Sequence, residues 1–241
     1  LIRWIDAKTD AMVAARRVRA RADAPAPAAA YSRGEQIAHY FTHGTGLAAS
    51  VAALVLLIVF AAVRGGDARH IGSAIVFGVA LVGLYAAFMN FRRNRATHWR
   101  ENFHKYNHAA AFILIAGTAT PFLVGSVGGA WGWGLLGVVW SLSLIGAACR
   151  INGSERARNV SRGAYLSLAL VGLVAFKPVL ANLPQGALWL LFGGALCYVL
   201  GTVFHVSQRI RYHKVMRHAF AIGGSACHLI AVLLFVLPRA G

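Results

Sequence analysis

Acidic residues are scarce in this chain, and charge of either sign is missing from most of its length. Only 7 of the 241 residues are Asp or Glu, against 24 Lys and Arg, and 58% are hydrophobic. Every acidic residue, and every basic residue except Lys177, lies outside the long apolar runs. A soluble globular protein carries about 25% charged residues. The composition therefore excludes that class and indicates an integral membrane protein.

Cysteine is also rare, and nothing in the chain looks like a disulfide framework or a cleavable signal peptide. Cys149, Cys197 and Cys227 lie in or beside apolar segments and form no C-x-x-C pair. Such a set is typical of buried free thiols. The first apolar run follows a basic arm of about 35 residues, which is too long and too polar for the n-region of a signal peptide.

Seven apolar runs have the length of about 20 residues that spans a hydrocarbon core of about 30 Å. They cover residues 40–63, 71–91, 108–127, 129–149, 163–182, 185–205 and 218–238. The predicted fold class is therefore all-α integral membrane, a bundle of seven transmembrane helices. Residues 36–241 are expected to form this membrane domain.

Residues 1–35 are expected to form a basic cytoplasmic arm. Apolar side chains are interspersed with Arg and Lys over residues 1–22, which suits an amphipathic helix lying on the membrane surface. The Ala/Pro stretch ADAPAPAAA that follows is typical of a short, stiff linker. A solvated basic tail is the alternative interpretation.

The basic residues predict the orientation of the bundle. Twenty of the 24 lie in the arm and in the second, fourth and sixth loops, which are all on one side of the membrane. The positive-inside rule places this side in the cytoplasm and the C-terminus outside. The net charge of +17 then reflects topology and attraction to anionic lipid headgroups. We therefore expect membrane lipids, and not nucleic acid, as partners.

Polar side chains gather at the expected cytoplasmic ends of the helices. Glu35, His39 and His43 follow one another at intervals of four residues and so share one helix face. His228 lies ten residues beyond His218, about 15 Å deeper along its helix, and needs a polar partner there. The other members at these ends are Asn90, Asn107, His108 and His205. A polar cavity open to the cytoplasm is one interpretation, and capping of helix ends is the other.

The segment IAGTATP, residues 115–121, is a second polar feature within the third run. Gly117 allows close approach of a neighbouring helix, and Thr118 and Thr120 can bond backbone carbonyls or other helices. Pro121 leaves one carbonyl without its usual donor and is expected to kink the helix. Helix packing is the favoured role for this segment.

Four further motifs follow one another over nearly all of the chain after the arm: GEQIAHYFTHGTG, NHAAAFILIAGTATP, GGALCYVLGTVFH and SACHLIAVLLFV. In sequence and order they resemble the motifs of the hemolysin III family, the bacterial branch of the progestin and adipoQ receptor superfamily. The resemblance implies seven helices, a cytoplasmic N-terminus and a location in the bacterial cytoplasmic (inner) membrane. It also implies a zinc site of three histidines with an aspartate nearby, as in hydrolases whose zinc would activate a water molecule.

This chain departs from the family at most positions of that site. Asn90 and Gly224 stand where the family has two of its zinc-binding histidines, Asn107 stands at the aspartate and Ala86 at a serine. Only His228 is retained. We therefore predict a vestigial polar site without catalytic residues or a bound cofactor, made of Glu35, His39, His43, Asn90, Asn107, His108 and His228. A rebuilt zinc site of His39, His43 and His228, with Glu35 as base, is the less favoured alternative.

These observations favour a non-catalytic membrane protein that serves as a structural or accessory subunit of a larger membrane complex. A bioenergetic or photosynthetic assembly is one conceivable host. The alternatives are a zinc-dependent amide or lipid hydrolase with the rebuilt site, and a receptor-like lipid-binding protein that uses the old cavity. A haem or chlorophyll ligand at His228 is a further, weaker alternative. A wide pore is not expected, because the helix interiors are uncharged.

Overall fold

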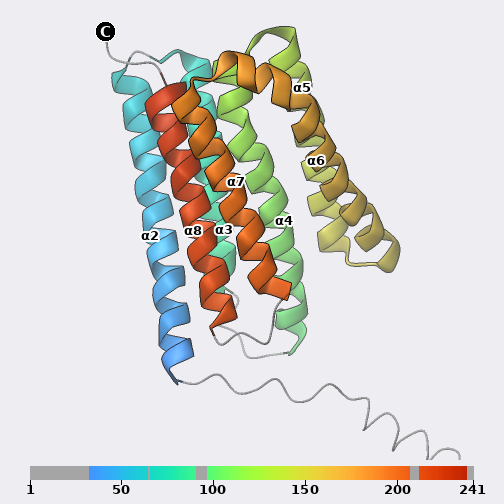
Figure 1. The fold of residues 1–241 in the computed structure, drawn as a ribbon. Helices are drawn as coiled ribbons and strands as arrows, with labels where there is room; N and C mark the ends of the chain where they lie inside the picture. The colour runs from blue at the N-terminus through green and yellow to red at the C-terminus, as the bar shows by residue number, and fades with distance from the viewer. Residues whose placement is uncertain (1–32, 65, 91–96, 207–211, 238–241) are drawn as a thin grey trace, which may run out of the picture. The chain divides into compact units, whose positions relative to one another are not determined.

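The computed structural model describes residues 33–64, 66–90, 97–206 and 212–237 (Figure 1). The side chains of several residues at helix ends, including Glu35, His39, Asn90 and His205, lie outside this description. The amphipathic helix and linker expected in the arm also lie outside it. Residues 37–241 form one compact unit.

The seven predicted membrane helices are all present. Their bounds are α2 (Arg33–Val63), α3 (Ala68–Asn90), α4 (Thr97–Pro121), α5 (Gly129–Asn152), α6 (Glu155–Asn182), α7 (Gln185–Val206) and α8 (His213–Ala231). Two π-helical segments, η1 (Phe122–Val127) and η2 (Val232–Val236), continue α4 and α8. Within the described residues, seven helices are long and apolar enough to cross a membrane, which confirms the predicted fold class.

Helix α6 begins eight residues before the start predicted from hydropathy. The sequence indicated residue 163, whereas the helix starts at Glu155. The side-chain oxygen of Ser154 accepts a hydrogen bond of 3.2 Å from the backbone N–H of Ala157, so Ser154 caps the helix. The first two turns of α6 are polar, and a search for apolar runs therefore assigned them to the loop.

Pro121 changes the helix type at the end of α4, where the sequence predicted a kink. Proline has no N–H to donate within the helix, and the chain passes directly into the wider turns of η1. Thr120 donates to the carbonyl of Ala116 at 2.7 Å and accepts a bond of 3.1 Å from the indole N–H of Trp140 on α5. The threonine thus bonds both its own helix and a neighbour, as predicted for this segment.

Helix α4 contributes to both groups of buried side chains. One apolar cluster joins α2, α3, α7 and α8, and the other joins α5 and α6. A β-carbon placed on Gly117 would lie 2.5 Å from that of Ala80, so α4 and α3 approach closely at this glycine. Figure 1 shows α6 beside α5, with which it makes its main contacts. Only 11% of the membrane span of α6 is buried inside the protein.

Successive helices run in opposite directions (Figure 1), so the start of α4, the turn between α5 and α6 and the start of α8 lie at one end of the bundle. A β-carbon placed on Gly153, between α5 and α6, would lie 2.7 Å from the ammonium nitrogen of Lys105 on α4. At the same end, the rings of His43 on α2 and His218 on α8 are in contact. This end is the one that the charge distribution predicts to face the cytoplasm, and the orientation in the membrane stays a prediction.

Candidate functional site

The predicted polar site divides into two levels along the bundle, and His43 belongs to the level near the basic loops. Its ring lies 4.0 Å, centroid to centroid, from the ring of His218, and both side chains are buried. Phe88 on α3 packs against His218 at 4.8 Å and His43 at 6.0 Å. Arg217 lies 3.3 Å from the Nε2 atom of His218. The rings of the two histidines and Phe88 therefore pack edge to face and join α2, α3 and α8.

Three hydroxyl groups form a chain of hydrogen bonds at the deeper level. The hydroxyl of Ser225 on α8 lies 3.0 Å from that of Tyr85 on α3 and 2.8 Å from that of Tyr198 on α7. Tyr85 and Ser225 are buried. Because each hydroxyl has a partner, the cost of removing these polar groups from water is offset within the protein. The network ties three helices together.

His228 lies on the same helix as Ser225 and has a backbone partner, as its depth required. Its Nε2 atom is 3.1 Å from the carbonyl oxygen of Leu191 on α7. A carbonyl oxygen only accepts, so Nε2 carries the proton and donates. The Nδ1 atom is then the bare nitrogen, and it is buried without a hydrogen-bond partner. Nδ1 is thus a buried acceptor of His228 without a donor among the described residues.

Helices α7 and α8 cross at a pair of glycines directly beside this histidine. A β-carbon placed on Gly224 would lie 2.9 Å from the carbonyl oxygen of Gly194 and 3.0 Å from the ring of Tyr198. A β-carbon on Gly194 would lie 2.5 Å from the ring of His228. All three distances are shorter than ordinary contacts between carbon and other heavy atoms. The crossing therefore depends on glycine at both positions.

This crossing bears on the zinc site that the family resemblance implies. A structural or catalytic zinc ion needs at least three ligands, drawn from His, Cys, Asp and Glu. Gly224 offers no ligand, and the space beside it is filled by Tyr198 and by the backbone of α7. Within the described part of the chain, no three potential ligands gather closely enough to hold a metal ion. The described residues thus do not fit zinc.

The residues of the alternative zinc site are only partly described. His43 contacts His218, and His228 bonds to Leu191. The side chains of His39 and Glu35 lie outside the described residues, so a three-histidine site with them stays a prediction. The structure does show that the two histidines have different neighbours. The ring of His43 packs against His218 and Phe88, whereas His228 bonds to the backbone of α7.

Asn107 and His108 lie about three turns into α4, and His108 contacts α6. The hydroxyl of Tyr165 on α6 donates to the carbonyl oxygen of His108 at 3.4 Å, and its ring stacks on Phe112 with 3.9 Å between centroids. The side-chain oxygen of Asn107 is buried without a hydrogen-bond partner. Asn90 is the residue expected to accompany Asn107, and its side chain lies outside the described residues.

The sequence prediction missed the three residues of the hydroxyl network. Tyr85, Tyr198 and Ser225 each lie within an apolar run, and the search for ligands concentrated on histidines, amides and acids. A usable signal was present, since polar groups within membrane helices are costly and require partners. Their meeting at one point, however, could not be read from three separate runs.

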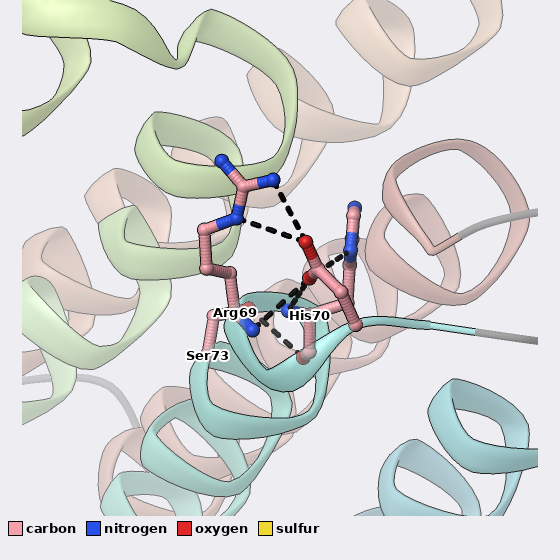
Figure 2. Close-up of polar contacts among 4 residues, drawn as sticks. Arg69, His70 and Ser73 are labelled. Carbon is pink, nitrogen blue, oxygen red and sulfur yellow. Dashed lines mark hydrogen bonds and ion pairs between the residues drawn. The ribbon is translucent and has the colours of Figure 1, made fainter.

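A further cluster of polar side chains, around Asp67, lies at the opposite end of the bundle, where α3 begins. The carboxylate of Asp67 accepts from the backbone N–H groups of Arg69 and His70, and thereby caps α3. It also binds the guanidinium of Arg69 and the ring Nδ1 of His70, each at 2.8 Å (Figure 2). The hydrogen bond from the His70 backbone and the contact with Arg69 hold the pKa of Asp67 well below its usual range.

Among the described residues, seven helices apolar enough to cross a membrane pack around buried apolar clusters, and they define an all-α integral membrane protein. The family model described as haemolysin-III related matches residues 32–229. The "Hemolysin-3 homolog" of Bacillus subtilis (strain 168) is 37% identical over 201 residues, which are 83% of this chain and 94% of that protein. The "Hemolysin-3" of Bacillus cereus is 33% identical over 206 residues, or 86% of this chain and 94% of that protein. The chain belongs to the hemolysin III family, and this agrees with the predicted location in the bacterial cytoplasmic membrane.

Proposed function

We propose that this protein is a non-catalytic member of its family that acts as a structural or accessory subunit of a larger membrane complex. The close crossing of α7 and α8 at Gly224 is the observation that carries this proposal. A zinc hydrolase needs three protein ligands and an open position for water. At Gly224, where the family is thought to carry one ligand, Tyr198 and the backbone of Gly194 leave no space for a side chain.

The hydroxyl network at the same depth supports a structural role. Tyr85, Tyr198 and Ser225 satisfy one another and come from three helices. Satisfied polar networks in a low-dielectric interior make a fold rigid and specify one arrangement of its helices. Groups that acted on a substrate would instead be expected to point into an accessible space.

The outer surfaces of α6 and α7 support the second half of the proposal, a protein partner in the membrane. Only 11% of the α6 span and 17% of the α7 span are buried inside the protein. Small residues on membrane helices allow close approach of another helix. Gly163 and Gly172 on α6 are exposed, and a β-carbon placed on either would have no neighbouring atom within 4 Å. Helix α6 thus offers a face suited to a partner helix, alongside membrane lipids.

The zinc content of the protein tests the first part of the proposal, that the protein is not a zinc hydrolase. The protein is purified gently from native membranes without a metal-affinity column, and zinc per chain is measured by elemental analysis. We expect far less than one zinc per chain, with the same value for His228→Gln. About one zinc per wild-type chain, lost in the His228 variant, would contradict the proposal and favour the hydrolase with His39, His43 and His228.

Site-specific photo-crosslinking in native membranes tests the second part of the proposal, that the protein is a subunit of a larger membrane complex. A photoreactive residue replaces Leu173, which is 71% exposed on α6, and the matched control replaces Val55, which is 54% exposed on α2. We expect adducts with one other membrane protein from position 173 and not from position 55. Adducts with lipid alone at both positions would refute a partner on α6.

A further inference from the structure

Three basic side chains lie around the turn between α5 and α6: Lys105 on α4, Arg150 on α5 and Arg158 on α6. Gly153 lies between them, in the left-handed conformation with φ of +73°, and ends α5. The guanidinium of Arg158 donates to the carbonyl oxygen of Gly153 at 2.8 Å. A β-carbon on Gly153 would lie 2.7 Å from the ammonium nitrogen of Lys105. Lys105 and Arg158 therefore both contact this one turn.

Arg150 brings a third positive charge to the same turn, from the last turn of α5. Its Nε atom is buried and has no hydrogen-bond partner, although a buried guanidinium N–H requires an acceptor. The side chain is also near enough to the hydroxyl of Tyr165 to interact with it electrostatically. Arg150 thus presents an unused donor at the edge of the bundle.

Few described negative charges lie beside these three cations. Among the described residues, the ion pairs all involve Asp67, at the other end of the bundle. Glu155 is the one acidic residue on the α5–α6 turn, and it is exposed. Glu101 lies one turn before Lys105 on α4, and its side chain lies outside the described residues. The positive dipole end of α6 and the negative dipole end of α5 meet at this turn and offset each other. An anion placed here would therefore be attracted by the three side-chain cations.

We propose that Lys105, Arg150 and Arg158 form a binding site for the phosphate group of an anionic phospholipid. Guanidinium groups match phosphate oxygens in shape and charge. The site lies at the ends of helices that are long and apolar enough to cross a membrane, which is where lipid headgroups are expected. Ile151 and Val160, both exposed, flank the turn and offer apolar surface for the start of the acyl chains. The lipid's phosphate supplies the acceptor that the Nε atom of Arg150 lacks.

Lipid binding to the purified full-length chain tests this site, measured by native mass spectrometry in a neutral detergent. Phosphatidylglycerol is titrated against phosphatidylcholine with the same acyl chains. The variants are Arg150→Gln and Arg158→Gln. Arg162→Gln is the matched control, because it removes the same charge from α6 one turn further from Gly153, where the guanidinium of Arg162 bonds to Asn159 at 2.9 Å and not to the turn.

We expect phosphatidylglycerol to bind roughly tenfold more weakly to each test variant, the factor that follows from losing one charge-assisted hydrogen bond. Binding to the control and binding of phosphatidylcholine should stay unchanged. An equal loss in Arg162→Gln, or no loss in either test variant, would show that any affinity is a general charge effect and overturn the site. If Arg150→Gln does not fold, the surface variant Arg158→Gln decides alone.

A second arm distinguishes a lipid headgroup from a free anion of the same chemistry. Inorganic phosphate is added to the wild-type protein already loaded with phosphatidylglycerol. We expect the lipid to stay bound, because its acyl chains also contact the protein. Displacement of the lipid at millimolar phosphate, absent in Arg150→Gln, would overturn the assignment to lipid and identify a site for a soluble phosphate.

Discussion

Replacing Gly224 by alanine perturbs the crossing of α7 and α8, and Gly223 offers a matched control one residue away. The new methyl group at position 224 would lie 2.9 Å from the Gly194 carbonyl oxygen and 3.0 Å from the Tyr198 ring. At position 223 the nearest atom is the sulfur of Cys197, at 3.8 Å, an ordinary contact. Both changes remove a glycine from the same helix, so the gain in helix propensity of about 1 kcal/mol cancels in the comparison.

The difference between the two variants therefore isolates the clash. Overpacking in a well-packed interior costs about 1–3 kcal/mol, and a backbone oxygen moves less readily than a side chain. We expect Gly224→Ala to be less stable than Gly223→Ala by about 2 kcal/mol. For a chain of this size, that corresponds to a Tm lower by about 4–8 °C.

Thermal unfolding in one detergent, followed by circular dichroism or by scanning fluorimetry, measures this difference. Equal Tm values for the two variants would mean that α7 and α8 separate easily at Gly224. In that case a larger side chain, including a zinc-binding histidine, would fit there, and the argument against a hydrolase would fail.

Two further predictions concern the hydroxyl network and the cap of α3. Ser225→Ala removes the hydroxyl that joins Tyr85 and Tyr198. We expect it to lower the free energy of unfolding by about 1–3 kcal/mol. Ser126→Ala, at a partly exposed position on η1, is the control and should change this free energy little. Asp67→Asn tests the cap of α3. The folded-state pKa of Asp67 is depressed, so its contribution is complete above the ordinary pKa near 4 and declines as the pH falls toward the folded value. Wild type should therefore lose stability in acid below about pH 4 more steeply than Asp67→Asn, and parallel curves of Tm against pH would contradict the cap.

The seven helices and the segregation of charge could be predicted from the sequence because hydropathy is a local property. Twenty consecutive apolar residues cross a bilayer whatever their neighbours are. The close approach at Gly117 and the bonds of Thr120 were likewise readable, since they depend on residue type and helix spacing. The start of α6 at Glu155 was not, because a polar helical turn looks like a loop to a hydropathy search.

The sequence alone also predicted which family ligands are replaced, since Gly224 and Asn107 carry no side chain that zinc prefers wherever they lie. Tertiary structure alone decided what takes their place. His43 meets His218, Ser225 joins two tyrosines from different helices, and Tyr198 fills the space beside Gly224. These partners lie far apart in the chain, and their contacts follow from how helix faces rotate and cross. That choice is made by the packing of all seven helices together, which no single apolar run encodes.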